Sequence, residues 1–350
     1  MRRPRLAFVC RASASVGMGH LMRSGAVAAA AMPHAETRLL VIGDRAAGTL
    51  RAASGVPGAV YSSDDAAIEA AISWDPGAVV LDMTELDESQ VSKLTDCPVA
   101  SLSPVFDRLD RCDLFFHRTI HHPLAHLAAD RSGWRLGLDY AVVRRACARI
   151  PTERYLEAIA PGHRLPVAVC MGGGDAGNKT LRVLERLREI DRPMTFWVLL
   201  GEGYGHSHDE LFDAARHGSR HEIILARTTE SMWRVMRSCA VGVFAAGTVT
   251  YEAAAAGLPS INLFEERSHG YLVEELVERG VALDAAAPFD VALDRATDML
   301  CTFDSVRDEL LAMHRASEGL IDGRADERIV RGLLDATGVL RVPAPAKEVA

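Results

Sequence analysis

The sequence has little that points to metal, disulfide or membrane chemistry. Its 7 cysteines are scattered and form no C-x-x-C pair, which argues against a zinc site and a disulfide framework and suits a reducing compartment. No apolar run approaches about 18 residues, so we expect neither a membrane-spanning helix nor a membrane partner. After the basic start, Leu6–Cys10 is an apolar run of only strand length, which does not fit a signal peptide. We therefore expect a cytoplasmic protein.

Excess positive charge is also missing. The formal net charge is −8 and no basic patch stands out, so we expect no nucleic-acid partner. An anionic ligand would have to be held by local features such as helix N-termini. With 49% hydrophobic and 25% charged residues the composition is that of a globular protein, and 350 residues suit two domains of about 150 residues each.

Short apolar runs alternate with helical patterns along the whole chain. This alternation indicates βαβ units and parallel sheets. The predicted strands are Leu6–Cys10, Arg38–Ile42, Ala78–Asp82, Val99–Leu102, Leu114–His117, Val167–Cys170, Thr195–Leu200, Glu222–Leu225, Val241–Phe244 and Ser260–Leu263. The predicted helices are His20–Ala31, Asp64–Ser73, Asn178–Glu189, Glu230–Cys239, Thr250–Ala256, Gly270–Arg279, Asp304–Ala316 and Ala325–Ala336.

A proline- and charge-containing stretch separates two halves of the same plan. It covers residues 149–166 and predicts a domain boundary. We expect a Rossmann-like domain over residues 1–150, a second over 165–315, and a closing helix with a frayed tail over 316–350, the tail beginning at Val342.

The first of three glycine-bearing segments follows the first predicted strand. Gly17 and Gly19 allow a tight turn and a close approach of a ligand, and His20 then begins a helix at the carboxyl end of a parallel strand. A histidine there suits a general acid or base, or merely a helix-start hydrogen bond. The third glycine of a dinucleotide fingerprint is missing, because Met22 stands in its place.

The other two segments lie in the second half. Gly172-Gly173-Gly174 precedes a helix and predicts an amide-lined phosphate loop or a flexible turn, and no G-K-[ST] follows to make it a P-loop. Gly247 offers a further helix N-terminus to an anion. Glu252, one turn into that helix, could accept hydrogen bonds from a ribose diol or simply suit the helix dipole. Together the three loops predict one cleft between two doubly wound domains.

These segments resemble those of the UDP-sugar hydrolase of pseudaminic acid biosynthesis and, more distantly, of the N-acetylglucosaminyltransferase of peptidoglycan synthesis. Gly17-Met-Gly-His-Leu-Met-Arg23 is similar to the family's G-x-G-H-x-M-R motif, Met171–Thr180 to its phosphate loop and Ala246–Glu252 to its nucleotide-binding segment. Gly257-Leu-Pro259 matches the G-L-P that follows. The resemblance implies an α/β protein of the GT-B type, with two Rossmann-like doubly wound domains facing a central cleft.

The resemblance also implies roles for individual residues. His20 would be catalytic, and Asp82 would orient the water or the sugar, although a buried aspartate at a strand end is also a common structural feature. The residues expected to bind the nucleotide sugar are Gly17, Gly19, Arg23, Gly172, Gly173, Gly174, Asp175, Asn178, Gly247, Thr248, Glu252 and His269. The substrate would be a UDP-linked sugar, with no further cofactor and no metal.

The chain departs from the family pattern at positions that face the sugar. Arg11 replaces an aspartate, Ser103-Pro104 replaces an acidic pair, and His269-Gly270 replaces an N-Q pair. These changes predict a different sugar or a different acceptor. Three functions therefore stay open: a hydrolase in which His20 activates water, a glycosyltransferase with a soluble small-molecule acceptor, and a nucleotide-sugar binding protein without turnover.

A group of histidines begins at the last residue of the predicted strand Leu114–His117 and continues into the segment after it. It comprises His117, His121, His122 and His126. Their spacing matches no zinc motif and no paired acidic ligands stand beside them in the sequence. We interpret them as solvent-exposed or cleft-lining side chains.

Overall fold

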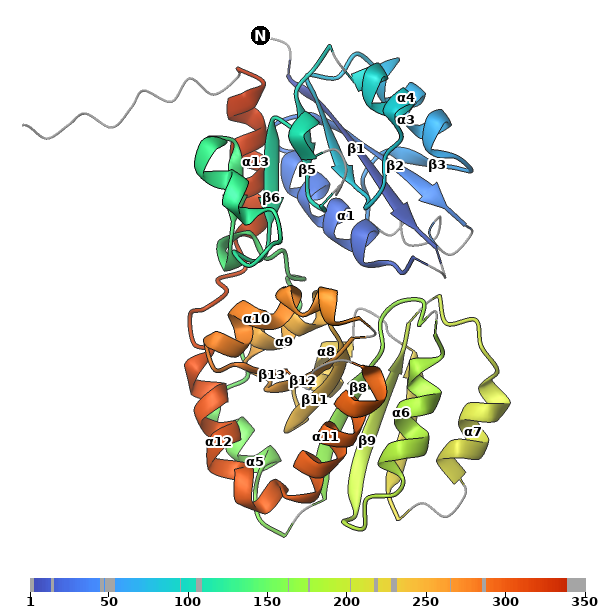
Figure 1. Ribbon diagram of the computed structural model, residues 1–350, viewed down its shortest axis with the longest axis vertical. Coiled ribbons are helices and arrows are strands. Elements are labelled where there is room, and N and C mark those ends of the chain that lie inside the picture. Colours follow the sequence, from blue (N-terminus) through green and yellow to red (C-terminus); the bar gives the residue numbers. More distant parts are fainter. Residues whose placement is uncertain are drawn as a thin grey trace, which may run out of the picture.

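The computed structural model describes residues 3–13, 16–44, 47, 54–94, 96–104, 109–162, 164–175, 177–201, 203–216, 220–227, 232–264, 266–284 and 288–338. Two parallel sheets, each flanked by helices, lie one above the other (Figure 1). The predicted frayed tail from Val342 lies outside the described residues. No helix among the described residues is both long enough and apolar enough to cross a membrane.

The first sheet has seven strands in the order β3-β2-β1-β4-β5-β6-β7. Its strands are β1 (Arg5–Ala12), β2 (Glu36–Gly43), β3 (Gly58–Tyr61), β4 (Ala78–Asp82), β5 (Val99–Ser101), β6 (Leu114–His117) and β7 (Trp134–Leu136). The strand order reverses between β1 and β4, and open α/β sheets bind ligands beyond the strand ends at such a point.

Alternation along β1 explains how both faces of this sheet are covered. Leu6 and Phe8 pack in one cluster with residues of α1 (Gly19–Ala31), while Ala7 and Val9 pack in another with residues of α3 (Asp64–Ile72). Successive side chains of a strand point to opposite faces, so a run of apolar residues is buried on both sides. The strand is therefore fixed beneath the glycine loop that follows it.

The second sheet repeats the plan with six strands in the order β10-β9-β8-β11-β12-β13. Its strands are β8 (Leu165–Cys170), β9 (Met194–Leu200), β10 (Glu222–Arg227), β11 (Val241–Ala245), β12 (Ser260–Leu263) and β13 (Ala282–Asp284). The helices of this half are α5 (Thr152–Ala158), α6 (Lys179–Leu187), α7 (His208–Arg216), α8 (Met232–Met236), α9 (Thr248–Ala256), α10 (Tyr271–Glu278), α11 (Phe289–Cys301) and α12 (Phe303–Ala316). The predicted α/β class with two doubly wound sheets is confirmed.

The predicted strands are all present, each within two residues at either end. The apolar pattern does not indicate β3, β7 and β13, which are short strands at sheet edges. It also misses α4 (Glu88–Val91), α5, α7 and α11. Of the predicted helix Glu230–Cys239, the described part is α8, and residues 228–231 lie outside the described residues.

The last helix, α13 (Ala325–Ala336), returns to the first sheet. Its Ile329 and Leu333 share the core cluster of Leu6 and Phe8, whereas α12 before it contributes Leu310 to the core of the second half. Figure 1 shows α13 beside β6, well away from α12. The chain thus passes between the halves twice, and the predicted domain limits of 1–150 and 165–315 stay predictions.

Leu333 provides a test of this return. Its side chain is 0% exposed, so Leu333→Ala should lower the free energy of unfolding by about 2–5 kcal/mol. The exposed Arg331 on the same helix is the matched control, and Arg331→Ala should stay within about 0.5 kcal/mol of the parent. Urea unfolding followed by circular dichroism measures both. Equal midpoints for Leu333→Ala and the parent would contradict the packing of α13.

Candidate functional site

A buried carboxylate organises the first half of the site. Asp82 ends β4 and is 0% exposed. It accepts hydrogen bonds from Arg23 Nε at 2.9 Å, from Ser24 Oγ at 3.1 Å and from Ser103 Oγ at 2.5 Å. Burial alone would raise the pKa of Asp82, but the charge of Arg23 and the hydrogen bonds from His20 and Arg23 hold it well below its usual range. The carboxylate is therefore ionised at neutral pH.

His20 begins α1 next to this carboxylate. Its Nδ1 lies 2.7 Å from Asp82 Oδ1 and 3.0 Å from Ser103 Oγ, and its side chain is 20% exposed. An ionised carboxylate only accepts hydrogen bonds, so Nδ1 donates to it, and Nε2 carries a lone pair whenever the imidazole is neutral. The structure thus brings the predicted pair His20 and Asp82 together with Arg23. Ser103, which the sequence shows only as a departure from the family pattern, completes the group.

Glycine loops of the two halves meet beside His20. A Cβ atom at Gly173 would lie only 2.9 Å from the backbone nitrogen of Met18, and one at Gly19 would lie 3.4 Å from Thr248 Oγ1. Gly17 and Gly172 have φ angles of +88° and +93°, which favour glycine. The structure therefore places the three predicted loops at one junction, with Gly174 following Gly173 in the middle one.

The two helix N-termini at this junction differ. At α6, the carboxylate of Asp175 accepts from the backbone nitrogens of Lys179 at 2.8 Å and Thr180 at 2.9 Å, so a side chain of the chain itself occupies this end. At α9, Gly247 is the N-cap and no side-chain hydrogen bond caps the helix. The partial positive charge of a helix N-terminus attracts anions. Thr248 at the start of α9 is thus the better placed of the two for a phosphate.

Other predicted binding residues have different surroundings from those expected. Glu252 is 1% exposed, and its carboxylate accepts from Arg144 Nε at 2.7 Å and Nη2 at 2.6 Å. Asn178 Oδ1 accepts from the Tyr204 hydroxyl at 3.0 Å. His269 is exposed just before α10, and no described contact joins it to His20. A nucleotide-binding role for these three stays a prediction.

Two further residues at the junction, Arg118 and Tyr251, are not among the predicted site residues. A small cavity of about 10 Å³ is lined by Arg118 and Tyr251 together with Arg23 and Thr248, which come from both halves. Arg118 directly follows β6, and polar residues after parallel strands were the signal that could have revealed it. Tyr251 lies in an alanine-rich helix, where nothing in the sequence distinguishes a lining residue from a core residue.

Two histidines at and after the end of β6 are more buried than expected. His117 and His122 are 3% and 2% exposed and their rings pack near Tyr271 of α10, so the solvent-exposed interpretation is wrong for these two. The contacts with Tyr271 place both rings between the first half and α10 of the second half. Burial lowers the pKa of His117 well below its usual value and that of His122 to about 4.

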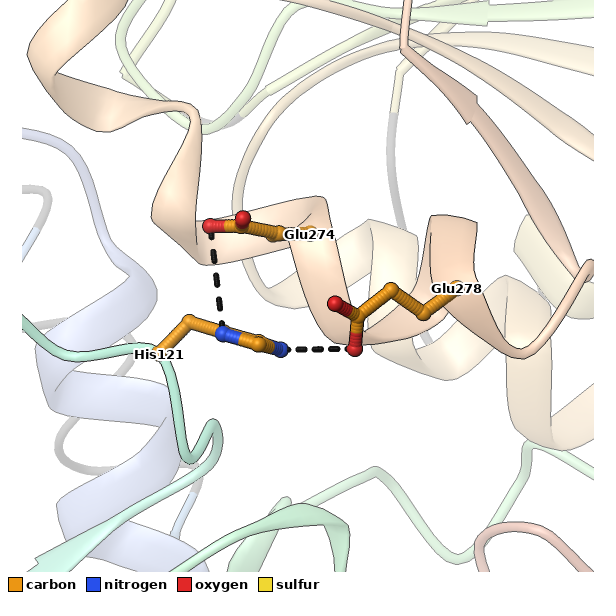
Figure 2. Close-up of side chains that lie close together, drawn as sticks. All are labelled: His121, Glu274 and Glu278. Carbon is orange, nitrogen blue, oxygen red and sulfur yellow. Dashed lines mark hydrogen bonds and ion pairs between the residues drawn. The ribbon is translucent and has the colours of Figure 1, made fainter.

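His121 lies between two carboxylates, which the sequence did not indicate. Figure 2 shows its ring facing Glu274 and Glu278 of α10, with Nε2 at 2.7 Å from Glu278 Oε2 and Nδ1 at 4.0 Å from Glu274 Oε2. One ligand atom from each of the three lies within 4.8 Å of the others. These contacts join the loop after β6 to α10 of the second half. The neighbouring Ile120 nitrogen donates a hydrogen bond to Glu275 of the same helix.

The lowered pKa of His122 predicts a pH dependence of stability. The unfolded chain takes up a proton at this residue near pH 6.5, but the folded chain only near pH 4, so folding loses free energy as the pH falls between these values. The loss is about 1.4 kcal/mol per pH unit for one group. His122→Asn keeps an acceptor for the Leu124 nitrogen, which donates to His122 Nδ1 at 3.0 Å. It should flatten the dependence measured by urea unfolding at pH 7, 6 and 5.

The exposed His126 offers the matched control for that series. His126→Asn should keep the pH slope of the parent chain. If His122→Asn also keeps it, the histidine is not held in its neutral form by the fold.

Solved structures with a similar fold are known, all at low sequence identity to this chain. No protein-family model and no curated protein matches the chain. Among solved structures it is similar to MurG of Acinetobacter baumannii, with a TM-score of 0.63, 14% identity, and 95% of this chain and 100% of that chain covered. It is also similar to S. aureus MnaA in a structure with UDP, with a TM-score of 0.64, 12% identity and 97% and 98% covered.

A third similar structure is the UDP-GlcNAc 2-epimerase of Neisseria meningitidis bound to UDP-GlcNAc. Its TM-score is 0.57 at 10% identity, with 95% of this chain and 100% of that chain covered. Identities this low carry the fold and not the reaction. Together with the two doubly wound sheets, these likenesses show that the chain has the GT-B fold.

Proposed function

We propose that the chain binds a nucleotide-diphosphate sugar, UDP-linked, between its halves and hydrolyses the anomeric C–O bond. The observation that carries this proposal is the His20–Asp82 pair beside the uncapped start of α9. A general base and an anion-binding helix end are the two features that displacement of a nucleotide diphosphate by water requires. The solved structures with UDP and UDP-GlcNAc support the substrate class.

The residues would divide the reaction as follows. His20 Nε2 takes a proton from water, whose oxygen attacks the anomeric carbon. The bond from that carbon to the diphosphate oxygen breaks, and its electron pair leaves with the nucleotide. Asp82 stays ionised and stabilises the imidazolium through Nδ1. The first-turn amides of α9 and the loop at Gly173 would stabilise the charge on the leaving group.

A glycosyltransferase is the second candidate. The chain is also similar to the calicheamicin glycosyltransferase CalG4, with a TM-score of 0.55 and 14% identity. Arg11, one of the departures from the family pattern, donates from Nε to Asp64 Oδ1 at 3.0 Å and so points to α3. In a transferase, the side of the first half that departs from the family pattern would hold a small-molecule acceptor in place of water.

Nucleotide release tests the proposal. UDP-, dTDP-, GDP- and CMP-sugars are incubated with the protein without an acceptor, and products are identified by mass spectrometry. We expect UDP and a free sugar, and a loss of about 100- to 10,000-fold in rate for His20→Ala. Affinity for UDP should be unchanged in this variant, because His20 acts on the water. The exposed His34 gives the matched control, His34→Ala.

Three outcomes separate the candidates. Full turnover by His20→Ala would remove the residue from its assigned role. Intact substrates that become glycosides once small-molecule acceptors are added would replace the hydrolase with the transferase. Saturable UDP binding without any product would leave a binding protein.

A further inference from the structure

Arg118 is a cation without a matching anion. It directly follows β6, its Nε is buried with no hydrogen-bond partner, and none of the ion pairs among the described residues includes it. Its guanidinium carbon lies 4.8 Å from the ring centroid of Tyr251. Arg118 as a whole is partly exposed, but an arginine keeps its charge in proteins, so burying its Nε without a hydrogen-bond partner or a carboxylate opposes folding. Arg118 therefore does not serve the stability of the ligand-free protein, which points to a role in binding a ligand.

The second observation is what surrounds this cation. The cavity at the junction of the halves is lined by Arg118, Arg23, Thr248 and Tyr251. Arg23 is already matched by Asp82, so the unmatched charge comes from Arg118. Tyr251 follows Thr248 by three residues and therefore lies on the same side of α9, one turn from its uncapped end. Arg118 of the first half thus reaches the helix end of the second half that favours anions.

We propose that Arg118 and the first turn of α9 form an oxyanion site that is completed only where the two halves meet. The proposal rests on the proposed function and adds a substrate-binding residue to it. A planar guanidinium binds phosphate or carboxylate with two parallel hydrogen bonds. The oxyanion is a phosphate of the nucleotide diphosphate or a carboxylate carried by the sugar, and these two sources make different predictions.

The stability of the ligand-free protein distinguishes this site from a purely structural role. Arg118→Met keeps an apolar stem against Tyr251 and removes the charge together with the buried Nε. If the arginine serves a ligand, the variant melts at the same temperature as the parent or higher. If the arginine serves the fold, the variant melts lower.

Binding is measured by calorimetry with uridine, UDP, UDP-glucose and UDP-glucuronate. For a phosphate ligand, Arg118→Met should bind UDP and both UDP-sugars about 10- to 100-fold more weakly and bind uridine unchanged. For a carboxylate ligand, only UDP-glucuronate should lose affinity. Arg118→Lys should recover part of the lost affinity, because lysine restores the positive charge but not the two parallel hydrogen bonds of a guanidinium. The exposed Arg331→Met is the control for the change in net charge.

Two results would overturn the oxyanion site. One is equal affinity of parent and Arg118→Met for all four ligands, and the other is an equal loss for all four including uridine. Failure of the proposed function looks different, because the parent protein itself would then bind neither UDP nor any UDP-sugar.

Discussion

Burial of the Asp82 carboxylate is the constraint on which the candidate site depends. A carboxylate with no solvent contact is stable only if its oxygens are fully hydrogen-bonded and opposed by positive charge. Here the opposing charge is Arg23 from α1, and a hydroxyl comes from Ser103 after β5. Three neighbouring segments of the first sheet are therefore tied to one group. The same group orients the ring of His20, so the interaction that stabilises this corner of the fold also positions the residue proposed as the general base.

The second half contributes by leaving a helix end uncapped. Both α6 and α9 follow a glycine-bearing turn, and the sequence assigns both to phosphate binding. Asp175 closes the end of α6 with two hydrogen bonds from backbone nitrogens, and that helix needs no ligand to satisfy them. At α9 the N-cap is Gly247, which has no side chain to offer. The first turn of α6 is thus satisfied within the protein, whereas the first turn of α9 has no side-chain cap and is the one proposed to bind an anion.

The sequence predicted the parts of this protein that depend on local pattern. The strands followed from short apolar runs, whereas the pairing of His20 with Asp82 was expected only from the resemblance, and the parallel pairing of β1 with β4 brings the two together. Contacts across the halves could not be predicted. Glu252 meets Arg144, 108 residues away, and His121 meets Glu278, 157 residues away. Such pairs form only when the two folded halves pack together, and neither hydrophobic periodicity nor secondary-structure propensity indicates how they pack.

Docking also limits how a substrate could enter. Met18 and Gly173 are too close for even one added carbon, and on another side of the junction the Ile120 nitrogen is bonded to the buried Glu275. At these contacts the nucleotide sugar of the proposed function could pass only if the halves separated. In the part of the chain that the structure describes, it passes between the halves before α5 and between α12 and α13. A ligand bound by groups from both halves favours the closed arrangement, because its contacts are complete only there. Substrate binding and exclusion of bulk water from His20 would then be one event.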